Sequence, residues 1–229
     1  STLSFQADQA IVMHCPADQL VAIQTYIGTL AVFALLQAAV TNELDQARFE
    51  LERTVEMLRE LLPEWAEASE RWREFLDRET PLYLLGRGST LGAVSEGVLL
   101  MHETAKAPAV GMSAAQFRHG PVEVVDENFH AIVIGTQPAT SELDAALADD
   151  LTRMGGHVRW LGPAPKRQPI EALCSWPADV PERFASIFET VPLQLAAYRK
   201  AELRGIRPGD FRWAPAITNS EAGFPAVHH

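Results

Sequence analysis

The second half of the chain alternates short apolar runs with segments of helical spacing, and this alternation limits the possible folds more than any other feature. The runs that have the length and composition of strands are 81–86, 109–114, 128–136 and 157–163, the second of them typical of a sheet edge. The helical segments are 90–105, 114–119, 141–156 and 182–205. Such an order predicts an α/β fold in which helices flank a mainly parallel sheet.

The first 78 residues follow a different pattern. QAIVMH (9–14) predicts a short strand, and Asp18 is placed to cap the helix that follows it. Residues 21–40 are nearly long enough to span a membrane, but polar residues interrupt them, so we expect a buried core helix. A charged amphipathic helix at 44–61 precedes another that we expect to begin at Pro63.

These elements predict two parts of unequal completeness. Residues 79–229 contain a whole α/β unit, whereas residues 1–78 contain too little for a sheet of their own. We therefore expect residues 1–78 to be the tail of an upstream α/β domain, or to complete their core against another chain.

The charge and the cysteines exclude several classes of function. A net charge of −11 and a pI of about 5.1 argue against binding to nucleic acids or to anionic membranes. Cys15 and Cys174 have no spacing typical of a metal site, so we expect reduced thiols in a cytoplasmic protein. The first residues lack the pattern of a signal peptide.

GRGSTLG (86–92) lies between a predicted strand and a predicted helix. Backbone N–H groups there could hold a phosphate, with help from the hydroxyl groups of Ser89 and Thr90. The same glycines also suit a tight turn that binds nothing, so both interpretations stay open.

Two motifs carry residues suited to proton transfer. Glu96 and Glu103 lie seven positions apart on an apolar helix, where desolvation would raise a carboxyl pKa, unless the side chains reach water or an arginine. His119 precedes Gly120-Pro121, so its imidazole should be displayed at a helix end, as a catalytic group or as a surface histidine. Arg118 could bind an anion or simply carry a surface charge.

SEGVLLMHETA (95–105), followed by SAAQFRHGPVEVVD (113–126), resembles the signature of the SIS (sugar isomerase) superfamily. That superfamily includes the isomerase half of glutamine:fructose-6-phosphate aminotransferase and ketosamine-phosphate deglycases. The segments 7–30, 82–97 and 189–218 also resemble it, so the likeness covers essentially the whole chain.

The resemblance implies a three-layer SIS-type fold, in which 1–78 ends a first SIS domain and 79–229 forms a second one with a C-terminal tail. It implies that Glu103 is the base that moves a proton between two sugar carbons. It also implies that His119 opens the sugar ring, commonly in the site of a neighbouring subunit of a homodimer. Pocket-lining residues would be Val21, Ser89 and Ala216.

The implied function is a phosphosugar isomerase or ketosamine-phosphate deglycase that needs no metal or organic cofactor. The alternative is a module that senses a sugar phosphate without converting it. Three departures from the family bear on this choice. The Ser/Thr-rich phosphate loop of the first SIS domain does not occur in this chain, and Ala216 and Gln24 stand where relatives carry lysines. A glutamine-dependent aminotransferase is therefore not expected from this chain alone.

Overall fold

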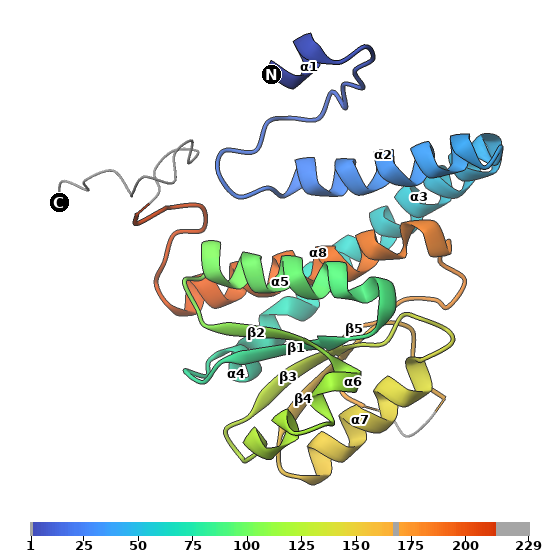
Figure 1. Ribbon diagram of the computed structural model, residues 1–229. Helices are drawn as coiled ribbons and strands as arrows, with labels where there is room; N and C mark the ends of the chain where they lie inside the picture. The colour runs from blue at the N-terminus through green and yellow to red at the C-terminus, as the bar shows by residue number, and fades with distance from the viewer. Residues whose placement is uncertain (1, 167–169, 214–229) are drawn as a thin grey trace.

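A computed structural model describes residues 2–166 and 170–213 and shows an α/β fold of three layers (Figure 1). Its sheet has five strands in the order β2-β1-β3-β4-β5, and every neighbouring pair is parallel. The strands are β1 (Leu82–Gly86), β2 (Ala109–Ser113), β3 (His130–Ile134), β4 (His157–Leu161) and β5 (Ala172–Cys174). The predicted fold class is confirmed, and the segment predicted as an edge strand, β2, does lie at an edge.

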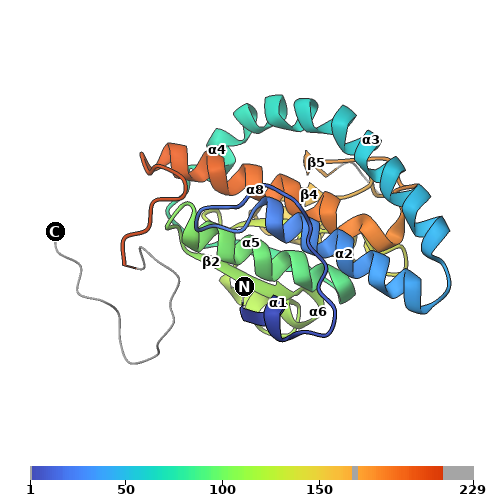
Figure 2. The ribbon, with the colours of Figure 1, turned by 90° about the horizontal axis from the view of Figure 1, so that it is seen from above.

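Helices cover both faces of the sheet. The α-helices are α1 (Thr2–Gln6), α2 (Gln24–Val40), α3 (Leu44–Ser69), α4 (Arg73–Leu76), α5 (Leu91–Glu103), α6 (Ala114–Phe117), α7 (Ser141–Arg153) and α8 (Ala185–Leu203). Short 3₁₀ turns are η1 (Glu70–Trp72), η2 (Gly88–Thr90), η3 (Pro121–Val124) and η4 (Glu182–Phe184). Figure 1 shows α5 and α8 on one face and α6 and α7 on the other, and Figure 2 shows α8 between α3 and α5.

Strand alternation divides the interior into two cores. Leu84 and Ile132 point to the α5 and α8 face, whereas Leu85 and Val133, their neighbours in sequence, point to the α6 and α7 face. All four side chains are fully buried because both faces of a parallel sheet are covered.

The helices that precede the sheet pack into the first of these cores. Trp65 of α3 lies against Trp176 and Phe188, with ring centroids 5.7 and 6.3 Å away. Phe75 and Leu76 of α4 belong to the same buried cluster. Residues on both sides of the predicted boundary at 78/79 therefore share one core, and the division into two SIS domains stays a prediction.

Two local predictions differ from the structure, and one strand was not predicted. Pro63 does not begin a helix, because α3 runs through it and buries Trp65, whose packing outweighs the backbone hydrogen bond that proline lacks. Residues 9–14 form no strand, since Met13 lies against Gly28 of α2 rather than beside a sheet. The three-residue β5 was not predicted, because so short a run carries no alternation.

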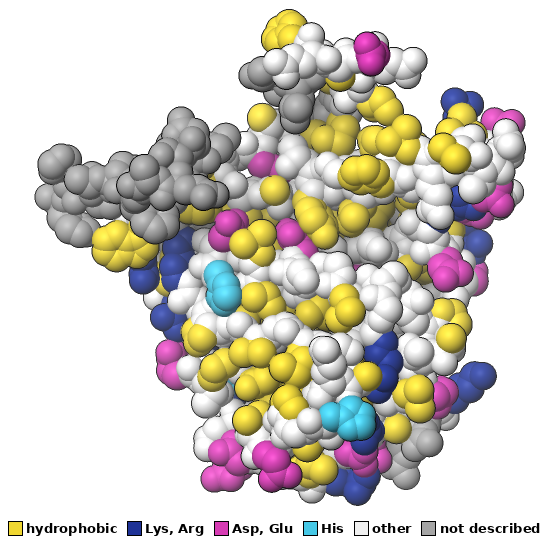
Figure 3. Space-filling view, viewed as in Figure 1, with side chains coloured by type: hydrophobic (Ala, Val, Ile, Leu, Met, Phe, Trp, Pro, Cys, Tyr) yellow, Lys and Arg dark blue, Asp and Glu magenta, His cyan; other side chains and the backbone are white. Residues whose placement is uncertain are grey.

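Residues 21–40 were predicted as a buried core helix, but α2 buries only Ala34 and Ala38, because it lies outside the layer of α5 and α8 (Figure 1), and it exposes apolar side chains. Phe33, Leu36 and Val40 are 65%, 42% and 84% exposed, and hydrophobic side chains gather along this top edge in Figure 3. Among the described residues, no helix combines the length and the apolar character needed to cross a membrane. The apolar surface of α2 is thus suited to contact with another protein surface.

Candidate functional site

Glu103 is the last residue of α5, and its side chain is half-buried. Glu96 lies two turns earlier on the same helix and is only 8% exposed. Burial, followed by the charge of Glu103, raises the pKa of Glu96. The strongly desolvated carboxyl group of this pair is therefore Glu96, whereas Glu103 keeps access to solvent.

Two further residues join Glu96, and the sequence did not indicate either. Burial raises the pKa of Tyr26 in α2, and the charges of Glu96 and of Glu189 in α8 raise it further. Glu189 is 1% exposed, and its Oε1 accepts a hydrogen bond from the Thr136 hydroxyl group. The helices α2, α5 and α8 thus bring the phenol group of Tyr26 near the two buried carboxyl groups of Glu96 and Glu189.

A groove of about 500 Å³ opens at the C-terminal end of α5, where Glu103 lies. Its walls come from the segment before α2, from α3, from the end of α5, from α8 and from the segment after α8. The lining residues are Asp18, Gln19, Leu20, Val21, Ile23, Leu62, Thr104, Val191, Gln194, Leu195, Tyr198, Pro208 and Gly209. The structure therefore places Val21, a predicted pocket residue, in a cavity next to the residue that follows Glu103.

Asp18 fixes the wall that carries Val21. Its carboxylate accepts hydrogen bonds from the backbone N–H groups of Ile23, Gln24 and Thr25 and from the Thr25 hydroxyl group, at 2.7 to 3.2 Å. Burial acts to raise the pKa of Asp18, but these hydrogen bonds outweigh it and hold that pKa below its usual value. Asp18 is not the N-cap residue of α2 that was predicted, because that position is Ile23, but the Asp18 carboxylate accepts hydrogen bonds from the first N–H groups of the helix.

Lys106 fixes the wall that carries Pro208 and Gly209. Its Nζ donates hydrogen bonds to the backbone carbonyl groups of Glu103 and Asp210, and it lies 5.2 Å from the ring centroid of Phe211. The segment that contains Pro208 and Gly209 is thereby tied to the end of α5.

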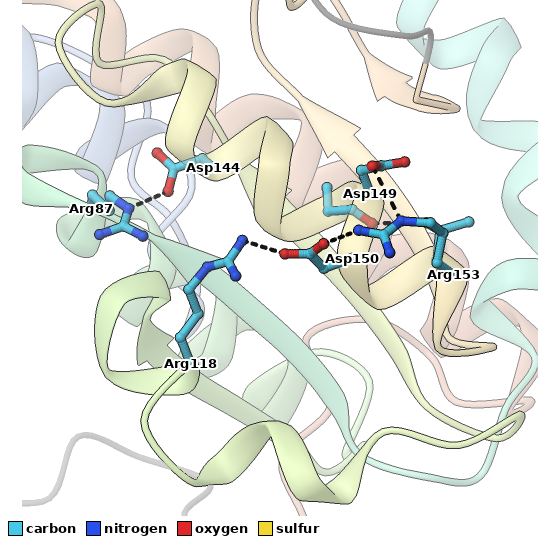
Figure 4. A network of polar contacts seen from close by, with 8 residues as sticks. Arg87, Arg118, Asp144, Asp149, Asp150 and Arg153 are labelled. Atoms are coloured by element: carbon cyan, nitrogen blue, oxygen red, sulfur yellow. Dashed lines mark hydrogen bonds and ion pairs between the residues drawn. The ribbon is translucent and has the colours of Figure 1, made fainter.

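His119 is exposed, as its position before Gly120-Pro121 predicts. Gly120 has φ of +125°, a conformation that favours glycine and turns the chain out of α6. Arg118 pairs with Asp150 of α7 at 2.8 Å, so its charge holds this bend onto α7 (Figure 4). The imidazole is therefore displayed on a bend that an ion pair ties to α7.

Glu103 and His119 do not meet within one chain. Glu103 ends a helix on the α5 and α8 face, whereas His119 follows α6, whose Phe117 belongs to the core on the α6 and α7 face. The sheet separates the two faces (Figure 1). A site that uses both residues would need them from two copies of the chain.

Ser89 lies just before the other end of α5 from Glu103, about 21 Å away by the rise of an α-helix. Its hydroxyl group accepts a hydrogen bond of 2.5 Å from Gln137, and it lines a separate cavity of about 610 Å³. Arg87, two positions before it, pairs with the buried Asp144 at 2.6 Å (Figure 4). Of the three predicted pocket residues, Val21 and Ser89 thus lie in different cavities, and Ala216 lies outside the described residues.

Metal ligands were not predicted. In the part of the chain that the structure describes, no group of three or more His, Cys, Asp or Glu side chains is arranged to hold a metal ion. The chemistry available around the groove is that of carboxyl, phenol and hydroxyl groups and of Lys106.

Comparison with known proteins identifies the family. The family model of the SIS domain matches residues 75–199, more than half of the chain. The chain belongs to the SIS domain family. Within this SIS domain, the match begins in α4 and ends in α8, so it includes both Glu103 and His119.

The relatives of this SIS domain are longer proteins. It is 28% identical over 206 residues to a glutamine–fructose-6-phosphate aminotransferase (isomerizing) of Pyrococcus horikoshii, covering 88% of this chain and 34% of that protein. Its fold resembles the C-terminal domain of a glucosamine-fructose-6-phosphate aminotransferase from Francisella tularensis, with a TM-score of 0.77 and 23% identity over 92% of this chain and 62% of the other. The fold also resembles tagatose-6-phosphate ketose/aldose isomerase from Escherichia coli, with a TM-score of 0.65 and 21% sequence identity. This match covers 96% of this chain and 60% of the other. The chain thus spans about a third of the curated relative and about three fifths of the solved chains.

Proposed function

We propose that this SIS domain carries the base of a phosphosugar isomerase or ketosamine-phosphate deglycase that acts by proton transfer. The observation that carries the proposal is the position of Glu103, half-buried at the end of α5 beside a groove of small-molecule size. The names of the relatives, which concern fructose, glucosamine and tagatose phosphates, support the same substrate class.

In the proposed reaction, the substrate is an open-chain sugar phosphate. The Glu103 carboxylate accepts the proton from the carbon next to the carbonyl group, which leaves an enediolate whose negative charge lies on the former carbonyl oxygen. The proton of the neighbouring hydroxyl group passes to that oxygen, and Glu103 returns its own proton to the former carbonyl carbon, so the carbonyl group moves to the neighbouring carbon and aldose and ketose interconvert. With a ketosamine phosphate, the same proton transfer produces the imine of the aldose, and water hydrolyses this imine to the free sugar phosphate and an amine.

The proposal assigns ring opening to His119 of a second copy of the chain. Each copy presents Glu103 on one face of its sheet and His119 on the other, so a pair of copies could bring one of each together. The exposed apolar residues Phe33, Leu36 and Val40 of α2 support such a contact between copies, because burying them is favourable.

Glu103→Gln tests the base. This variant should lose roughly 10²- to 10⁴-fold in turnover of ketose and ketosamine phosphates. Glu123→Gln, which makes the same change at an exposed residue of η3, is the matched control and should keep full activity. Undiminished turnover by Glu103→Gln would refute the assignment. Thermal stabilisation of the native protein by sugar phosphates without any product would instead indicate the sensor.

Mixing two inactive variants tests the shared site. Glu103→Gln and His119→Ala, mixed in equal amounts after reversible dissociation, should regain about a quarter of native activity, because half of the dimers then contain one intact site. Neither variant alone should show this activity. A mixture that stays as inactive as its components would contradict a site built from two copies.

A further inference from the structure

We propose that the groove at the end of α5 binds an uncharged, apolar substituent of the substrate. This inference rests on the proposed function and narrows its substrate class to ketosamine phosphates whose nitrogen carries an alkyl or aryl group. The sugar and its phosphate would lie outside the groove, toward Glu103.

The lining of the groove is unsuited to a phosphate or a carboxylate. None of the described residues that line it is a lysine, arginine or histidine. The one charged residue among the described lining residues is Asp18, and both of its carboxylate oxygens already accept hydrogen bonds from the N–H groups of residues 23–25 or the Thr25 hydroxyl group. An anion would therefore lose its hydration there without a compensating partner.

The walls of the groove instead suit hydrocarbon. Aliphatic side chains come from three separate parts of the chain, with Val21 before α2, Leu62 in α3, and Val191 and Leu195 in α8. The volume of about 500 Å³ lies within the range of small-molecule sites. Removing an apolar group from water into such a space is favourable in proportion to the area buried.

A single unpartnered polar group marks where the apolar substituent would join the sugar. Thr104 lines the groove and is only 6% exposed, yet its Oγ1 has no hydrogen-bond partner among the described residues. A buried hydroxyl group without a partner is costly, and a ligand nitrogen or hydroxyl group could satisfy it. Because Thr104 directly follows Glu103, this contact would hold the linking atom near the base.

A homologous series of ligands tests the groove without any reaction. The probes are the 1-(alkylamino)-1-deoxyglucitol 6-phosphates with ethyl, butyl and hexyl groups, together with a 5-carboxypentyl analogue that ends in a carboxylate. Calorimetry on the native protein should show affinity rising by up to about fourfold per added methylene, and the carboxylate-ended probe should bind at least tenfold more weakly than the hexyl probe. Equal affinity for all probes would overturn the proposal.

Variants locate the effect. Leu195→Asn places a polar group of similar size in the groove and should abolish the dependence on chain length, while Leu143→Asn, at an exposed position of α7, should preserve it. Thr104→Val keeps the shape of the side chain but removes its hydroxyl group, so it should lower the affinity of every probe by about the same factor. Unchanged chain-length dependence in Leu195→Asn would overturn the location.

The two proposals fail separately. Ketose phosphates converted by the native protein, with probe affinity independent of alkyl length, would remove the apolar subsite and leave the proposed function. Affinity that rises with alkyl length, with full turnover by Glu103→Gln, would leave the binding groove and remove the proposed base.

Discussion

The ammonium group of Lys106 donates a hydrogen bond to the backbone carbonyl oxygen of Asp210, 104 positions later in the chain. The same Nζ bonds the carbonyl oxygen of Glu103 at 2.5 Å, so the segment after α8 is fixed to the end of the helix that carries the candidate base. Lys106 has φ of +50°, which an L-residue with a side chain adopts at a cost. The cost indicates that the surrounding contacts impose this conformation.

Replacing Lys106 should release the segment after α8. Lys106→Met and Lys106→Gly both lack the ammonium group, so amide hydrogens of residues 206–213 should exchange faster with solvent in both, as measured by mass spectrometry. Lys106→Gly should also be more stable than Lys106→Met by about 1 kcal/mol, because glycine tolerates positive φ. Exchange rates equal to those of the native protein would contradict this role of Lys106.

The buried pair Arg87–Asp144 should be costly to break from one side. Asp144 is 1% exposed, and Asp144→Ala would leave the Arg87 guanidinium without its counter-charge in a largely buried position. The free energy of unfolding, measured in urea, should therefore fall by about 3–5 kcal/mol. Asp149→Ala on the same helix is the matched control (Figure 4). Its pair with Arg153 is half exposed, so it should cost less than about 1 kcal/mol. Similar losses from the two variants would show that Arg87 does not depend on Asp144.

Acid should destabilise the protein through His130. Burial, with the charges of Arg78, Lys200 and His157, lowers the pKa of His130 to about 4, so the folded state holds the neutral imidazole. The unfolded chain has the ordinary histidine pKa of about 6.5 and takes up the proton first. The stability contribution is therefore complete above pH 6.5 and is lost as the pH falls from 6.5 to 4, by up to about 3 kcal/mol.

Urea unfolding of the native protein and of His130→Gln at pH 7.5 and 4.5 measures this contribution. The variant is expected to be less stable at pH 7.5, because His130 packs edge-on against the Phe75 ring at 5.7 Å, but to lose less stability on acidification. Identical pH dependence in the two proteins would assign the acid sensitivity to other groups.

Glu189 should destabilise the protein as the pH rises. Burial raises the pKa of Glu189, and the hydrogen bond from Thr136 only partly opposes this. Because the folded-state pKa lies above the unfolded one, stability is lost as the pH increases from about 4.5 through the folded-state value. Glu189→Gln keeps the shape and an oxygen for Thr136, so its Tm should exceed that of the native protein at pH 8 by more than at pH 5. Glu182→Gln, an exposed change, should shift neither value.

Local patterns in the sequence predicted much of the fold and part of the site. The runs that became β1 and β3 are apolar apart from His130 because both faces of the sheet are covered, and this is visible in the sequence. The bend at His119 was also visible, since proline and glycine restrict the backbone wherever they occur. The relative burial of Glu96 and Glu103 was not visible, because their surroundings come from α2, α8 and the segment after α8.

The sequence by itself determined the alternation of β1 to β4 with helices, the α/β class, the exposed position of His119 and the placement of a glutamate at the end of an apolar helix. Each of these depends on backbone preferences and periodicity within a few residues. Only the tertiary structure decided that Val21 and Thr104 line one groove, that Ser89 lies in another, and that the sheet separates Glu103 from His119. Burial and cavities depend on contacts between residues that are distant in the sequence, so no local sequence pattern can predict them.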